Sequence, residues 1–157
     1  MKRYVAVASF ALLMFAVAAS LFAQNPALGT WKLNVAKSKY NPGPAPKSMT
    51  RTLEAQGDKI KHTYQGVAAD GSAISYSFTA AYDGKDYPIT GSAPGGADSL
   101  SITQPSPGTY EAILKKGGEV VLLSHAKISA DGKVTTFNQN SPSGKGSVNN
   151  IIVYEKQ

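Results

Sequence analysis

Short stretches of alternating apolar and polar residues, separated by turn-forming residues, run through the chain from residue 29 onward. Between residues 72 and 81, for example, Ile74, Tyr76 and Phe78 alternate with serines and a threonine. This alternation is typical of an antiparallel strand with one buried and one solvated face. Three Asp-Gly pairs, Asp83-Gly84 among them, lie between such stretches and are strong hairpin signals. The pattern predicts an all-β fold built from successive hairpins.

About ten strands are expected in meander order, and the first and last of them are both apolar and β-prone. We therefore predict that these two strands pair and that the sheet forms a single closed antiparallel barrel, because closure removes exposed edges. The continuous apolar run at 120–123 predicts a strand covered on both faces. The predicted strands are 29–34, 49–55, 59–67, 72–81, 85–90, 99–104, 109–115, 119–129, 133–138 and 148–156.

The start of the chain has the organisation of a secretory signal peptide. A positive segment, 1–3, precedes an almost wholly apolar segment, 4–22, and Ala23 precedes polar residues and Pro26. We predict a signal peptide at 1–23, with cleavage after Ala23 and with Ser20 as a second candidate. A retained membrane anchor is the alternative, since the apolar run is long enough to span a bilayer. The small-residue end and Pro26 favour cleavage, which leaves no stable membrane span.

The remaining residues, 24–157, form one predicted barrel domain that is either periplasmic or secreted. The chain has no cysteine, which excludes disulfides, lipid attachment through cysteine, thiol catalysis and thiolate metal sites. The net charge is +6, but the lysines form no dense run. A nucleic-acid partner is therefore not expected, because such proteins usually present a clustered basic face.

No residue pattern predicts catalysis, a metal site or a cofactor. The numerous serines lack the Gly-x-Ser-x-Gly surroundings of a nucleophile elbow. His62 and His125 have no third metal ligand at a recognisable spacing, so a structural or solvent-facing histidine is favoured. Glu111 and Glu119 flank a Gly-Gly turn, where a charged outer face explains them. We predict that the protein is not an enzyme.

The strand pattern resembles that of the calycin barrels, most closely the intracellular fatty-acid-binding proteins and, more broadly, lipocalin-like proteins. This resemblance implies a barrel with an interior ligand site. It covers most of the chain after residue 23, and its motifs follow the family's order. The matching segments are GTWKL at 29–33, TLE at 52–54 followed by Gly57-Asp58, ISYSF at 74–78 followed by Tyr82-Asp83, and YEK at 154–156.

Two departures from that family change what is expected of the ligand. The proline-rich segment 36–48 stands where the family has a two-helix lid, and it predicts an extended connection with no helical lid. The family's carboxylate-binding arginine, two residues before a tyrosine in the last strand, is replaced by Ile152 ahead of Tyr154. Neutral apolar molecules are therefore expected to bind better than acids of the same chain length. Arg51, the one arginine after residue 3, is the first alternative cation.

The alternation places several apolar and aromatic side chains on the inner face. Trp31 lines a cavity or, as such a tryptophan more often does, plugs one end of the barrel as a core residue. Tyrosine hydroxyls either point into the cavity or lie at the rim; the tyrosines concerned are Tyr64, Tyr76, Tyr87, Tyr110 and Tyr154. Ile74 is a further apolar contact. The predicted ligand-binding residues are Trp31, Tyr76, Phe78, Leu100, Ile102, Ile152 and Tyr154.

The sequence therefore predicts an exported, monomeric β-barrel that binds a small, partly apolar molecule. The alternative is a structural or interaction protein of the cell envelope whose barrel is fully packed and holds no ligand. Interior volume separates the two, since a core filled by Trp31, Tyr76, Phe78 and Phe137 favours the second.

Overall fold

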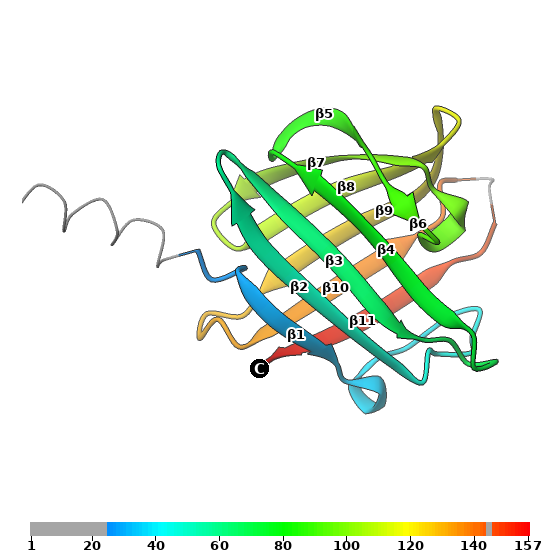
Figure 1. Ribbon diagram of the computed structural model, residues 1–157. Coiled ribbons are helices and arrows are strands. Elements are labelled where there is room, and N and C mark those ends of the chain that lie inside the picture. The colour runs from blue at the N-terminus through cyan, green and yellow to red at the C-terminus, as the bar shows by residue number, and fades with distance from the viewer. Residues whose placement is uncertain (1–24, 144–145) are drawn as a thin grey trace, which may run out of the picture.

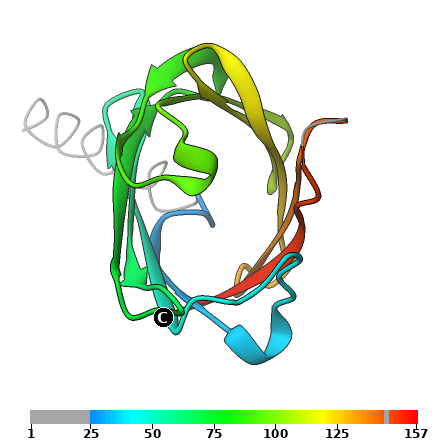
Figure 2. The ribbon, with the colours of Figure 1, turned by 90° about the vertical axis from the view of Figure 1, so that its right-hand side faces the viewer.

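The computed structural model describes residues 25–143 and 146–157, so the predicted signal peptide lies outside the described residues. Within these described residues, eleven antiparallel strands form one sheet that curls into a nearly closed barrel (Figures 1 and 2). The strands are β1 (Gly29–Leu33), β2 (Ser48–Gln56), β3 (Lys59–Val67), β4 (Ala73–Ala80), β5 (Asp83–Pro88), β6 (Thr90–Gly91), β7 (Ser99–Ser106), β8 (Thr109–Lys116), β9 (Glu119–Ile128), β10 (Val134–Asn140) and β11 (Asn149–Lys156).

The first and last strands lie side by side, as the sequence predicted. β1 pairs with β11 on one side and with β2 on the other, so that Trp31 stands opposite both Lys156 and Arg51. The order around the sheet is β5-β7-β8-β9-β10-β11-β1-β2-β3-β4-β6. The hairpins at 68–72 and 129–134 form where Asp-Gly pairs predicted them, each with a backbone hydrogen bond of 2.8 Å across the turn.

The predicted hairpin at Asp83-Gly84 is wrong. β5 pairs with β7, whereas β6, which begins two residues after β5 ends, pairs with β4. The Asp83 carboxylate accepts hydrogen bonds from the Lys85 backbone N–H and the Tyr87 hydroxyl, each 3.1 Å long. These bonds shape a local bend instead of a turn between paired strands. The segment 83–91 therefore bridges both edges of the sheet and leaves the barrel nearly closed.

The run at 120–123 is not covered on both faces, contrary to the prediction. Leu122 is buried inside the barrel, but the neighbouring Leu123 is 40% exposed on the outer face. These two residues lie opposite Leu114 and Ile113 in the regular part of the β8–β9 pairing. They therefore alternate between the inner and the outer face, and a continuous apolar run here does not mean two buried faces.

The segment that follows β1 contains no helix pair, as predicted. It holds one short 3₁₀ helix, η2 (Val35–Lys37), whose N-cap Asn34 accepts the Lys37 N–H at 3.0 Å. Beyond η2, Lys39 forms an isolated β-bridge with Ile151 of β11. The chain then runs extended through two cis-proline bonds, Asn41-Pro42 and Gly43-Pro44, into β2.

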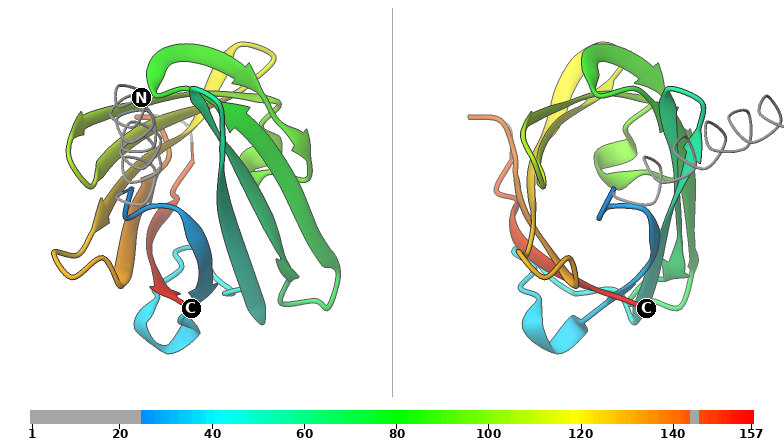
Figure 3. Two further views of the ribbon diagram at one scale, coloured as in Figure 1. Left: turned by 60° about the vertical axis from the view of Figure 1, so that its left-hand side comes forward. Right: turned by 90° about the vertical axis from the view of Figure 1, so that its left-hand side faces the viewer.

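Each end of the barrel is partly covered by a different segment (Figures 2 and 3). At one end, residues 25–28 fold inward, Ala27 is buried, and its carbonyl accepts the Trp31 indole N–H at 2.9 Å. The loop that contains the 3₁₀ helix η3 (Pro94–Gly96) lies over the lumen, with Ala93 and Ala97 buried. Among the described residues, no helix is long and apolar enough to cross a membrane.

Candidate functional site

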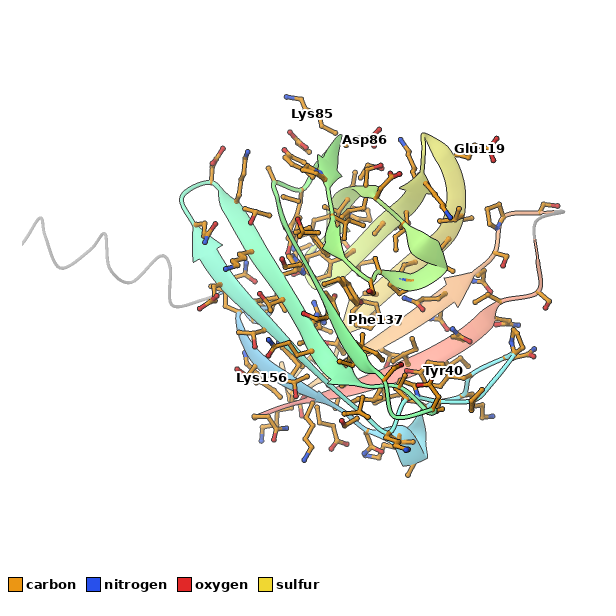
Figure 4. The ribbon with its side chains drawn as sticks, turned by 45° about the vertical axis from the view of Figure 1, so that its right-hand side comes forward. Tyr40, Lys85, Asp86, Glu119, Phe137 and Lys156 are labelled. Carbon is orange, nitrogen blue, oxygen red and sulfur yellow. The ribbon has the colours of Figure 1, made fainter. Side chains whose placement is uncertain are left out.

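The interior contains two adjoining cavities. The central cavity has a volume of about 60 Å³ and is lined from β2, β3, β4 and β7 to β10. The end cavity has a volume of about 260 Å³ and lies under the segments around Tyr40 and Ala93. Both cavities share the side chains that separate them, namely Tyr64, Tyr76, Pro94, Phe137 and Gln139. Figure 4 shows Phe137 within the barrel and Tyr40 near one end.

Six of the seven predicted ligand-binding residues line these cavities, but they divide between them. Phe78, Leu100 and Ile102 line the central cavity, and Ile152 and Tyr154 line the end cavity. Tyr76 lines both. Ile74, expected as a further apolar contact, lines the end cavity.

Trp31 lies outside both cavities and plugs the end of the barrel into which residues 25–28 fold, here called the closed end. Its side chain is fully buried in a cluster with Leu33, Leu53 and Ile128. The Lys156 ammonium lies 5.2 Å above the Trp31 ring and bonds to the Pro26 carbonyl at 2.9 Å. The structure therefore gives Trp31 the position of a core residue, the second of the two roles considered from the sequence.

Arg51 is the main charged group of the interior, and the sequence considered it only as an alternative cation. It is 4% exposed and lines the central cavity. Its guanidinium carbon lies 4.8 Å from the Phe137 ring centroid and 5.9 Å from that of Trp31. The Nε and Nη1 atoms are buried and have no hydrogen-bond partner. We expected acids to bind weakly because the last strand supplies no cation for a buried carboxylate. The inward position of Arg51 on β2 means that the interior does contain a cation.

His62 is the second buried polar group of the central cavity, at 2% exposure. Its ring stacks on Phe78 with centroids 4.4 Å apart, and its Nε2 lies 3.1 Å from the Tyr82 hydroxyl. Nδ1 has no hydrogen-bond partner. Burial, and then the nearby positive charge of Arg51, lower the pKa of His62 well below its usual value. His62 is therefore neutral at pH 7 and is a structural histidine, not a solvent-facing one.

Aromatic rings from β3 and β4 form a stacked row along one wall of the cavities. Tyr64 stacks on Tyr76 with centroids 4.4 Å apart and an interplanar angle of 9°. Tyr64 and Phe78 lie 6.3 Å apart at 25°. Because these residues pair across strands in register, their rings fix one another. The wall is thus preorganised before any ligand binds.

Four tyrosines, Tyr40, Tyr64, Tyr76 and Tyr154, line the end cavity. None of their hydroxyls forms a hydrogen bond with another residue in the described part of the chain. Burial raises the pKa of Tyr40 to about 12. Burial, followed by the nearby Tyr64 hydroxyl, raises the pKa values of Tyr76 and Tyr154 further. The phenols of Tyr40, Tyr76 and Tyr154 therefore stay protonated and can donate hydrogen bonds at physiological pH.

The remaining polar candidates lie elsewhere. Tyr110 lines the central cavity, but the Tyr87 hydroxyl bonds to Asp83 on the outer surface. His125 and Glu111 are exposed on the outer face of β9 and β8. Within residues 25–143 and 146–157, no group of three or more His, Asp or Glu side chains could hold a metal ion.

The inward position of Arg51 had a signal in the sequence. Met49, Arg51 and Leu53 alternate along β2 with Thr50, Thr52 and Glu54, and burial follows that alternation. The period of two therefore predicts an inward Arg51. The pattern does not show that the strands facing Arg51 supply aromatic rings and no carboxylate. Those contacts join residues that lie far apart in the chain.

Comparisons with known proteins identify the fold. No protein-family model and no curated protein matches the chain. Among solved structures, zebrafish ileal bile acid-binding protein with cholic acid matches with a TM-score of 0.53 and 12% identity, over 84% of this chain and 99% of that one. The S-type phycobiliprotein lyase of Guillardia theta matches at 0.52 and 11%, over 89% and 92%. A redesigned β-barrel matches at 0.51 and 12%, over 84% and 92%. The chain is a calycin-like β-barrel.

Proposed function

We propose that this protein is an exported β-barrel that binds a small, partly apolar molecule in its interior. The observation that carries the proposal is the pair of adjoining cavities, which persist although Trp31 and its neighbours fill the closed end. A barrel that served only as a scaffold would gain stability by filling this space, because unfilled volume in a core costs free energy. The proposal includes no catalytic step.

The chemistry of the cavity walls supports a ligand with an apolar body. The end cavity is lined mainly by apolar atoms of aliphatic side chains and aromatic rings; its polar groups are the tyrosine hydroxyls and the side chains of Ser92, Gln139 and Asn150. Small-molecule sites typically have this composition, a mainly apolar lining with a small number of placed polar atoms. The zebrafish protein of similar fold holds cholic acid, which is a fold-level analogy for a ligand of this kind.

The test compares two substitutions at neighbouring positions of β11. Ile152→Trp adds volume to the end cavity, whereas Ile151→Trp adds it to the outer face, where Ile151 is 38% exposed. A neutral fluorescent probe such as Nile red should bind the unmodified protein and Ile151→Trp, and should bind Ile152→Trp at least about tenfold more weakly. Equal binding by both variants, or no binding at all, would favour the packed-barrel alternative.

Native mass spectrometry of protein from its own host gives an independent result. A ligand that copurifies would appear as added mass, and the same spectrum would give the oligomeric state, which we propose to be a monomer. Export is also part of the proposal, and it rests on the charged, apolar and small-residue order of residues 1–23. A chain that begins at Gln24 after recovery from the periplasm or medium would support it, and an intact cytosolic chain would contradict it.

A further inference from the structure

Arg51 is a buried cation with no anion near it in the interior. The described residues that line the two cavities include no aspartate and no glutamate. Three ion pairs between described residues join exposed or half-buried side chains, Lys37–Glu155, Lys85–Asp83 and Lys115–Asp86. Removing a charge from water without a partner costs several kcal/mol, so a lone buried cation calls for an explanation in terms of function.

The surroundings of Arg51 compensate its charge only in part. The faces of Phe137 and Trp31 attract the guanidinium, because an aromatic ring presents negative charge density on its face. Rings stacked over the guanidinium, however, do not accept hydrogen bonds from its N–H groups, because these point outward in the guanidinium plane. Nε and Nη1 lack acceptors, and each of them is one donor of a guanidinium edge that can pair with a planar oxyanion.

The polar groups between the two cavities include further donors, the hydroxyls of two tyrosines, beside the Gln139 amide, which both donates and accepts. Tyr64 and Tyr76 line both cavities and have hydroxyls without partners among the described residues. Burial raises the pKa of Tyr76, so its hydroxyl keeps its proton and remains a donor. The region between the cavities thus offers a positive charge and several O–H donors. A ligand group that fits it must supply oxygen acceptors and a negative charge.

The cavity volumes determine the orientation of such a ligand. The central cavity, at about 60 Å³, holds only a small group, whereas the end cavity, at about 260 Å³, has room for an apolar body. Typical ligand sites measure about 300–1,000 Å³, so neither cavity alone suits a complete ligand. An amphiphilic molecule with its polar end toward Arg51 would occupy both.

We propose that the ligand is an amphiphile with a carboxylate head, that Arg51 binds this carboxylate in the central cavity, and that the apolar body lies in the end cavity. This proposal rests on the proposed function. It reverses the preference expected from the sequence, in which the last strand lacks an arginine. It places the anion site at Arg51 on β2, beside the tyrosine hydroxyls, and not at position 152 of the last strand.

The test compares decanoic acid, decanol and methyl decanoate by titration calorimetry at neutral pH. Trp31 fluorescence gives a second readout, because Trp31 is the only tryptophan and its ring lies 5.9 Å from the Arg51 guanidinium carbon. The acid should bind the unmodified protein at least about tenfold more tightly than the alcohol or ester. Arg51→Met should abolish this difference, and Arg51→Lys should retain part of it.

Lys32→Met is the matched control, since it removes an exposed positive charge from β1, the strand that pairs with β2. It should leave the preference for the acid unchanged. Equal binding of acid, alcohol and ester by the unmodified protein overturns the carboxylate inference while the proposed function stands, and this comparison needs no variant. Binding of none of them contradicts the proposed function itself. Acetate binding as tightly as decanoate would show a site for any small anion and would overturn the amphiphile.

Discussion

Trp31 and Arg51 stand opposite each other on β1 and β2, and they affect stability in opposite directions. Trp31 is fully buried, and its indole N–H donates to the Ala27 carbonyl. It fills the closed end of the barrel without an unsatisfied polar atom. Arg51 is nearly as buried but leaves two nitrogen atoms without acceptors. The first residue stabilises the empty protein, whereas the second destabilises it in a way that a bound anion can relieve.

The position of Trp31 leads to a stability prediction. Trp31→Ala should lower the free energy of unfolding by about 3–5 kcal/mol, because it removes a large apolar group and leaves a cavity. Urea denaturation followed by circular dichroism measures this. Trp31→Phe keeps most of the volume and should cost distinctly less. A loss below about 1 kcal/mol for the alanine variant would mean that the closed end tolerates an empty space.

His62 leads to a prediction about pH. Its folded pKa is depressed by burial and by Arg51, while its unfolded pKa stays near 6.5. Below pH 6.5 the unfolded chain therefore binds a proton that the folded protein does not, and stability falls as pH decreases. The slope approaches about 1.4 kcal/mol per pH unit.

Urea midpoints at several values between about pH 7.5 and 5 would check this dependence. His62→Gln, which can still bond to the Tyr82 hydroxyl, should flatten it. The exposed carboxylates with lowered pKa values, Asp70, Asp98 and Asp131 among them, lose their contribution only at lower pH. An equally steep decline in His62→Gln would show that another group is responsible.

At the scale of elements, the segment 83–91, which contains β5 and β6, decides how the barrel closes. Its two halves pair with strands at opposite edges of the sheet. Ile89, between them, donates its N–H to the Asp98 carbonyl at 2.8 Å. Gly91 then approaches β4 so closely that a Cβ atom would lie 2.2 Å from the Ser75 carbonyl oxygen, and its φ of 96° also favours glycine. The closure therefore depends on one residue without a side chain.

Gly91→Ala should lower the free energy of unfolding by about 3 kcal/mol, from strain and steric conflict together. Gly57→Ala is the matched control, since Gly57 also has positive φ but a Cβ atom at that position would have nothing within 4 Å. It should cost only about 1 kcal/mol, the backbone penalty alone. Chemical denaturation compares the two, and faster amide exchange in β4 should accompany Gly91→Ala. Equal costs would contradict a close approach at β6.

The same segment marks the limit of prediction from sequence. Strand β3 was predicted with the bounds that it has, and most hairpins were found, because alternation and turn residues are local signals. The partner of β5 is not local. Asp83-Gly84 has the chemistry of a hairpin turn, yet β7 competes for the strand, and only the need to close the barrel decides between them. The prediction at 120–123 failed for a related reason, since whether another element covers the outer side of Leu123 is not a local signal either.

The candidate site was predictable to a similar extent. Inward positions such as Tyr76, Phe78 and Ile152 follow from the period of two along each strand. Their division into two cavities does not, because it depends on how side chains from opposite walls meet across the lumen. The resemblance to fatty-acid-binding proteins implied that a carboxylate-binding arginine, if present, would lie in the last strand. The buried arginine lies instead on β2, and its lack of an acidic neighbour is visible only when all the strands are assembled.

At the scale of the whole molecule, the barrel has no covalent reinforcement. The chain contains no cysteine, so stability comes from the core clusters, the strand ladders and whatever binds inside. A ligand that binds only the folded state stabilises it by about 2.7 kcal/mol at a free concentration one hundred times the dissociation constant. For a domain of this size that is a substantial fraction of the usual total.

The uncompensated charge of Arg51 has a consequence for the lifetime of the protein. In an empty barrel the buried guanidinium has only aromatic rings as partners, whereas in a loaded barrel the proposed carboxylate would pair with it. The loaded barrel should therefore have the larger free energy of unfolding. Proteases cleave the opened state, and its population follows the free energy of unfolding when opening is fast. Empty molecules would then be degraded sooner than loaded ones, and the amount of protein that survives would follow the supply of the proposed ligand.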